Sequence, residues 1–176
     1  MRFLLIDRIV DYQAGESIRA VKSLSLAEDY LQDHFPLFPV MPGVLMLESM
    51  TQTCAWYMRM AEEFAYSMVT LDEARNVKYA NFVEPGQSLI VEAVLQKQEG
   101  RLYTFKAQGL VDDKVSVSAR LRLTCYNRSE LDGDYFAPLD AYCKQEMLQI
   151  FNLIYPPAAR NQAATNGQAA GGQLLR

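Results

Sequence analysis

The spacing of hydrophobic residues changes along the chain, and each change predicts a different element. Residues 2–10 and 16–24 are rich in strand-forming side chains and are separated by DYQAGE, whose glycine favours a turn. A β-hairpin is therefore expected at the start of the chain. From Val44 to about Met68 apolar residues recur at helical spacing and occupy other faces as well. A helix of this kind is expected to be enclosed by the rest of the protein.

Four later segments rich in Val, Leu, Tyr, Phe and Thr predict further strands. They span residues 76–83, 87–98, 101–112 and 114–126. Short connections such as EPGQ, QEGR and VDDK separate them, which indicates antiparallel neighbours. A hairpin, a long central helix and an antiparallel meander predict an α+β fold in which a curved sheet wraps the helix. This arrangement is called the hot dog fold.

The C-terminal part of the chain predicts an addition to this fold. We expect a hot dog domain at 1–128, a helical extension at 129–157 and a disordered tail at 158–176, which is rich in Ala, Gln, Gly and Asn. The extension should form an amphipathic helix that ends at Pro156 and Pro157. Its apolar stripe consists of Leu139, Tyr142, Met147, Ile150, Phe151 and Ile154.

Composition and charge exclude several classes of protein. Hydrophobic residues make up 50% of the 176 residues, which is typical of a folded domain rather than a disordered chain. The net charge is −4 and basic residues are not clustered, so nucleic-acid binding is not expected. The longest apolar stretch contains Glu48 and Arg59, which argues against a membrane span. Three cysteines without metal-like spacing favour a reduced setting, and we expect a soluble, cytoplasmic protein.

Residues 33–52, DHFPLFPVMPGVLMLESMTQ, contain the candidate chemistry. A lone loop histidine such as His34 is usually a surface or packing residue, but three prolines restrict this loop and could aim the imidazole. Pro42 and Gly43 mark the start of the central helix. The first N–H groups of that helix, around Gly43 and Val44, could polarise a carbonyl oxygen or simply begin an ordinary helix.

Glu48 lies one turn into the helix, and Gln52 follows at i+4 on the same face. A carboxylate among apolar neighbours must pair, take up a proton or take part in chemistry. An imidazole base and a carboxyl acid that face one cavity would suit removal of a proton next to a carbonyl, with loss of a β-substituent.

The order of residues in this stretch closely resembles the signature of bacterial 3-hydroxyacyl-acyl-carrier-protein dehydratases of the FabZ type. The matching positions are His34-Phe35-Pro36, Pro39, Met41-Pro42-Gly43, Glu48 and Gln52. FLLIDRI at 3–9 and VKYANFVEPGQ at 77–87 resemble strands of the same family. The resemblance covers about residues 1–124.

The resemblance implies a role for each matching residue. His34 would take the Cα proton, and Glu48, oriented by Gln52, would help to protonate the departing hydroxyl. The Gly43 amide, with Val44 beside it, would bind the thioester oxygen. The substrate would be a (3R)-3-hydroxyacyl chain on an acyl carrier protein, and the product a trans-2-enoyl thioester of fatty-acid or related acyl-chain biosynthesis. Neither a metal nor an organic cofactor is implied, and the active sites would lie at the interface of a homodimer or of a trimer of dimers.

Two other functions remain open. Asp33 and Leu37 stand where family members usually have glycine, and Leu37 together with the C-terminal addition favours an inactive acyl-binding hot dog scaffold subunit. A hot dog acyl thioesterase would activate water instead, and the presence of both His34 and Glu48 argues against it. The basic residues that could meet an acidic carrier protein are Arg75, Lys78, Lys97 and Arg101.

Overall fold

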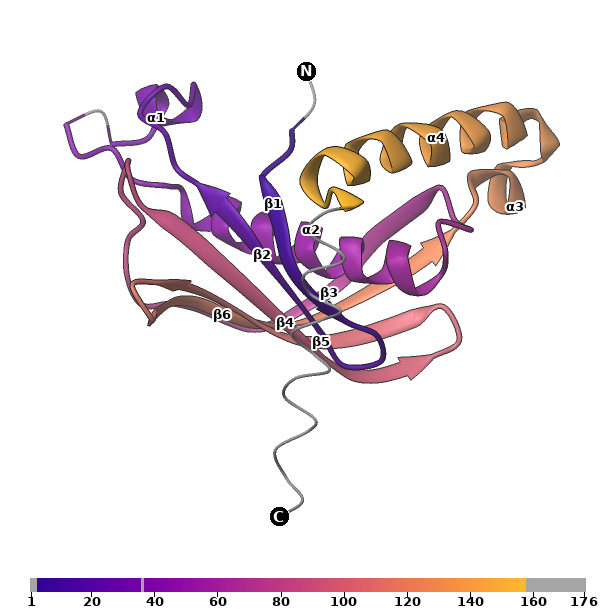
Figure 1. The fold of residues 1–176 in the computed structure, drawn as a ribbon, viewed down its shortest axis with the longest axis horizontal. Coiled ribbons are helices and arrows are strands. Elements are labelled where there is room, and N and C mark those ends of the chain that lie inside the picture. The colour runs from indigo at the N-terminus through magenta and orange to yellow at the C-terminus, as the bar shows by residue number, and fades with distance from the viewer. Residues whose placement is uncertain (1–2, 36, 158–176) are drawn as a thin grey trace, which may run out of the picture.

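The computed structural model describes residues 3–35 and 37–157, and its centre is a six-stranded sheet curved around one long helix (Figure 1). The strands are β1 (Arg8–Gln13), β2 (Ser17–Ser23), β3 (Met68–Tyr79), β4 (Ser88–Glu99), β5 (Leu102–Val111) and β6 (Lys114–Tyr126). All neighbouring strands are antiparallel, in the order β1-β2-β4-β5-β6-β3. The helices are α1 (Tyr30–Asp33), α2 (Gly43–Ala61), α3 (Arg128–Asp132) and α4 (Ala137–Ile154), with a 3-10 turn η1 (Asp134–Phe136). The predicted α+β arrangement is confirmed.

Helix α2 forms the centre of the core. Every residue from 53 to 58 on this helix is buried, and Met50, Cys54 and Met58 have no exposed surface. The sheet contributes inward-facing side chains such as Phe105 and Leu121, which are equally inaccessible. Each large apolar side chain buried in this way contributes about 1.5–3 kcal/mol relative to an exposed one. The expectation that the helix is enclosed is confirmed.

The end of α2 differs from the prediction. The helix stops at Ala61 rather than near Met68, because Glu63 and Phe64 adopt left-handed backbone conformations with φ of 49° and 59°. Strand β3 then begins at Met68, well before the predicted start at residue 76. The strand conformation of this polar segment depends on pairing with β6, a tertiary contact that the local sequence pattern does not reveal.

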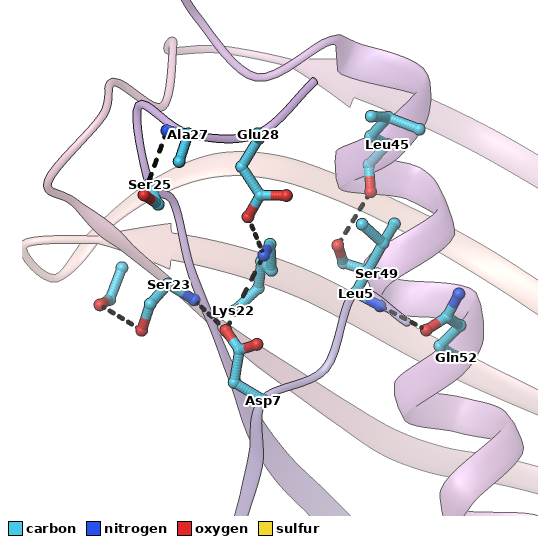
Figure 2. Close-up of polar contacts among 11 residues, drawn as sticks. Leu5, Asp7, Lys22, Ser23, Ser25, Ala27, Glu28, Leu45, Ser49 and Gln52 are labelled. Atoms are coloured by element: carbon cyan, nitrogen blue, oxygen red, sulfur yellow. Dashed lines mark hydrogen bonds and ion pairs between the residues drawn. The ribbon is translucent and has the colours of Figure 1, made fainter. Parts of the chain in front are cut away.

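The predicted first strand also begins later than expected, at Arg8. Before it, the backbone of Phe3 and Leu5 bonds to a side chain of α2, and Asp7 is the first residue to bond to β2. The Leu5 N–H donates to Gln52 Oε1 at 2.9 Å, as Figure 2 shows, and Gln52 Nε2 donates to the Phe3 carbonyl at 3.0 Å. The backbone of this segment is therefore bound by a side chain of the helix.

Helix α4 lies on the same side of the sheet as α2 (Figure 1). Its buried residues include Ile150, Phe151 and Ile154, as predicted. The Phe151 ring stacks on Trp56 of α2, with ring centroids 6.3 Å apart, and packs against Phe64 at 5.1 Å. The predicted stripe was wrong at its N-terminal end, where Leu139 is 46% and Tyr142 is 58% exposed.

Asp140 is the buried residue at that end of α4. Its carboxylate accepts hydrogen bonds from the backbone N–H groups of Arg128 and Ser129, both at 2.9 Å, and from the Ser67 hydroxyl. Burial by itself raises the pKa of Asp140, but these hydrogen bonds outweigh it and hold the pKa well below its ordinary value. The Asp140 carboxylate thus connects α4 to the start of α3 and to Ser67, the residue before β3.

The remaining predictions about organisation have different outcomes. The tail predicted at 158–176 lies outside the described residues, and the domain boundary near residue 128 stays a prediction. Within the described part of the chain, no helix is long and apolar enough to cross a membrane.

Candidate active site

His34 lines a cavity of about 310 Å³ at one end of the molecule. It follows directly after α1, a short helix that the sequence pattern did not predict, and its backbone is extended. The side chain is half-buried. The other residues that line this cavity are Val40, Met41, Gly43, Met46, Tyr79, Ala80, Asn81 and Phe82.

An ion pair positions the segment that carries His34. Lys22 on β2 is only 5% exposed, and its Nζ lies 2.5 Å from Glu28 and 3.9 Å from Asp7 (Figure 2). Glu28 belongs to the turn before α1, so the pair fixes this turn to the sheet. On the other side of His34, Phe35 adopts a left-handed conformation with φ of 51°, and the two ring centroids lie 4.4 Å apart. Contacts on both sides therefore help to aim the imidazole.

The start of α2 forms another wall of the His34 cavity. Gly43 is the first helical residue, and the carbonyl of Pro42 accepts hydrogen bonds from Leu45 and Met46. A Cβ at position 43 would lie 3.1 Å from Cε1 of Tyr79. Glycine therefore leaves room for the tyrosine ring to pack directly against the first turn of the helix. The first N–H groups of a helix have no intrahelical partner and carry the positive end of its dipole. They can donate to an oxygen in the cavity, whereas Val44 is 68% exposed and lies outside the cavity lining.

Glu48 lines a second cavity, of about 220 Å³, farther along α2. Gln52 Nε2 donates to Glu48 Oε1 at 2.9 Å, which confirms that the two residues share one face of the helix. The Gln52 amide is itself oriented by its bond from the Leu5 N–H (Figure 2). The carboxylate is therefore held in place by a neighbour with a fixed orientation.

A single chain does not bring His34 and Glu48 into one cavity. In the part of the chain that the structure describes, the two cavities have no lining residue in common. The sequence analysis required both groups to face one cavity. The two half-sites must come from different chains if they are to act on one substrate.

An exposed apolar surface lies beside the His34 cavity. Its members are Phe38, Val44, Tyr79 and Phe82, which are between 49% and 68% exposed. Strand β3, which ends at Tyr79, is an edge strand of the sheet. Exposed apolar patches and edge strands are typical of surfaces that bind another chain.

Two residues of these cavities were missed by the sequence analysis. Tyr79 was included in a family-like strand but was not assigned to the site, although its ring lines the His34 cavity. Arg59 lines the Glu48 cavity, yet in the sequence it only interrupts an apolar helix. The sequence does contain one signal that Arg59 belongs with Glu48. The two residues are eleven positions apart, about three helical turns, so they lie on the same face of the helix.

Leu37 and the three cysteines, which the sequence analysis considered, do not line either cavity. Leu37 is fully exposed and lines neither of them in the single chain. Cys54, Cys125 and Cys143 are free, and burial raises the pKa of the Cys125 thiol to about 11. Among residues 3–35 and 37–157, no group of three His, Cys, Asp or Glu side chains could hold a metal ion.

Comparison with solved structures supports the class of fold. A chain of the dehydratase heterocomplex ApeI:P from Xenorhabdus doucetiae superimposes with a TM-score of 0.60, at 19% identity over 73% of this chain and 86% of that chain. A thioesterase from Haemophilus influenzae gives a TM-score of 0.52, at 13% identity over 67% and 77%. The protein has the hot dog fold, which it shares with both of these neighbours although one belongs to a dehydratase complex and the other is a thioesterase.

Sequence comparison defines the family more narrowly. Residues 1–120 match the model of the FabA-like domain, and the chain belongs to that family. It is 41% identical to the 3-hydroxyacyl-acyl-carrier-protein dehydratase FabZ of Albidiferax ferrireducens over 129 residues, which cover 70% of this chain and 83% of the relative. The FabZ of Lawsonia intracellularis is 35% identical over 129 residues, covering 72% and 84%. The resemblance found in residues 33–52 is confirmed.

Proposed function

We propose that the protein dehydrates 3-hydroxyacyl thioesters carried by an acyl carrier protein to trans-2-enoyl thioesters. The observation that carries this proposal is that a chain of the FabA-like family carries both half-sites that the reaction needs, in two separate cavities. One half-site joins His34 to the amide end of a helix at Gly43, and the other holds Glu48 by Gln52.

The residues divide the chemistry of elimination between them. The thioester oxygen accepts a hydrogen bond from the Gly43 N–H, which stabilises negative charge as the Cα–H bond breaks. The His34 imidazole takes that proton. The Glu48 carboxyl group donates a proton to the β-hydroxyl, so that the C–O bond breaks and water leaves. The proton on His34 then returns to Glu48 through water, which restores both groups.

The complete site is proposed to form between two chains. His34 of one chain would face Glu48 of its partner in a homodimer. The exposed apolar residues beside the His34 cavity and the edge strand β3 supply the surface for this contact. A trimer of such dimers, which the family resemblance implies, is part of the same proposal.

A row of basic side chains is proposed to meet the carrier protein. Arg75 on β3, Arg120 on β6 and Lys106 on β5 are exposed and directly opposite one another across the strands. Like charges in direct cross-strand pairs destabilise a sheet, so an acidic partner would relieve this repulsion. Lys78, from the sequence prediction, precedes Tyr79 of the His34 cavity. Lys97 and Arg101 form ion pairs with Glu99 and Glu130, and within the row Arg75 pairs with Glu73.

The test is incubation with 3-hydroxyacyl carrier thioesters of several lengths, followed by enoyl absorbance and separation of the products. Formation of the trans-2-enoyl thioester supports the proposal. Release of free acid would indicate a thioesterase, and binding without turnover would indicate an acyl-binding scaffold.

A further inference from the structure

We propose that the cavity beyond Glu48 receives an acyl chain whose far end bears a carboxylate, and that Arg59 binds this carboxylate. This inference rests on the proposed function, because it assigns Glu48 to the reacting end of the substrate. It adds a specificity-determining residue at the opposite end.

The face of α2 supplies the geometry. Glu48, Gln52, Ala55 and Arg59 follow one another at spacings of four, three and four residues, and all line the same cavity. At 1.5 Å per residue, Arg59 lies about 16 Å along the helix axis from Glu48. A chain that starts at the carboxyl acid would therefore run along α2 toward the guanidinium.

Arg59 has a buried N–H donor without a partner. Its Nε is buried and has no hydrogen-bond acceptor among the residues that the structure describes. Its guanidinium lies 5.3 Å from the centroid of the Trp56 ring, which compensates only part of the lost hydration. Burial lowers the pKa of Arg59 to about 10, so the side chain remains protonated at neutral pH. A half-buried guanidinium with a buried, unused N–H donor in a cavity is well satisfied by an anion from a ligand.

Apart from Glu48, Thr51, Gln52 and Arg59, the walls of this cavity are apolar, and the C-terminal helix contributes to them. Met147 of α4 lines the cavity together with Leu4 and Val69. Trp56, another wall residue, is held from behind by Phe151 of α4. An alkyl chain fits these walls, but a methyl group at the far end would leave the guanidinium donor unsatisfied. A carboxylate can accept two parallel N–H groups from arginine.

The experiment compares two 3-hydroxyacyl thioesters of equal chain length that end in a methyl group or in a carboxylate, over a series of lengths. We expect the wild-type protein to favour the carboxylate at least tenfold in kcat/KM at the length that reaches Arg59. In Arg59→Met the ratio should fall to about one or below, and Arg59→Lys should keep part of it. Arg8→Met is the matched control, because Arg8 is an exposed arginine on the edge strand β1 that lines neither cavity. This variant should keep the wild-type ratio. Thermal melts establish that each variant is folded.

Each outcome decides a different claim. Equal or faster turnover of the methyl-ended substrate by the wild-type protein at every length would overturn this inference and leave the proposed function standing. A carboxylate preference that survives in Arg59→Met would also overturn it. Turnover of neither substrate would overturn the proposed function, and this inference with it. If Arg59→Met does not fold, the wild-type ratio and Arg59→Lys still decide.

Discussion

At the scale of single residues, His34 is positioned mainly by its backbone and its neighbours. Replacement by alanine removes the base but leaves the Lys22–Glu28 pair that fixes the preceding turn. We expect His34→Ala to lower turnover by about 10²-fold or more, since an aimed base typically contributes that much. Its free energy of unfolding should change by about 1 kcal/mol or less, because the side chain is only half-buried. Steady-state rates and thermal melts check this, and a near wild-type rate would eliminate the mechanism.

Glu48 allows a sharper substitution. In Glu48→Gln the new amide oxygen can still accept the hydrogen bond from Gln52, so the shape and the contact are kept. The amide cannot deliver a proton, and we expect turnover to fall by about 10²-fold with an unchanged melting temperature. Initial rates of the two proteins on one substrate make the comparison. Equal rates would mean that Glu48 only positions the substrate.

The site residues found from sequence were those with a local signal. His34, Gly43, Glu48 and Gln52 lie within one short motif, where spacing alone relates them. Arg59 became a candidate only when the structure showed its unsatisfied Nε inside the Glu48 cavity. Burial and missing partners are properties of tertiary packing, which residue spacing does not encode.

At the scale of elements, the periodic segments were predicted better than their ends. The long apolar helix and the strands that end at Val111 and Tyr126 follow from hydrophobic pattern and turn residues. The strand from Met68 to Arg75 could not be predicted in this way, because its charged residues form a strand only through pairing with β6. At the N-terminal end of α4 the buried residue is Asp140, not Leu139 or Tyr142 as predicted. Hydrogen bonds from Arg128 and Ser129 make the buried carboxylate favourable.

The attachment of α4 can be tested with one pair of substitutions on the same helix. Phe151→Ala removes a buried ring that packs on Trp56 and Phe64, and should cost about 3–5 kcal/mol of unfolding free energy. Leu153→Ala is the matched control, because Leu153 is 79% exposed, and should change stability by about 0.5 kcal/mol or less. Urea unfolding of both variants measures the difference. Equal stabilities would show that α4 is only loosely attached.

At the scale of the whole molecule, the basic row on β3, β6 and β5 can be separated from catalysis. Arg120→Ser removes its central charge, which lies opposite both Arg75 and Lys106. We expect KM for carrier-bound substrates to rise about fivefold, the ratio that corresponds to about 1 kcal/mol for an exposed charge pair. The KM for a small thioester without a carrier protein should not change. Arg8→Ser, on β1 at the opposite sheet edge, is the control, and an equal effect on both kinds of substrate would rule out a carrier contact.

The separation of His34 and Glu48 into two cavities of one chain leads to the last prediction. His34→Ala and Glu48→Ala proteins should each be inactive, because every site in either homodimer lacks one group. After subunit exchange, a heterodimer has one doubly damaged site and one intact site. Random reassortment then restores about a quarter of all sites, as the symmetry of an isologous dimer requires. Activity that rises toward this level with exchange time supports a site shared between chains. If both residues acted from the same chain, no heterodimer would contain an intact pair, so zero recovery after exchange has been demonstrated by mass spectrometry would disprove the shared site.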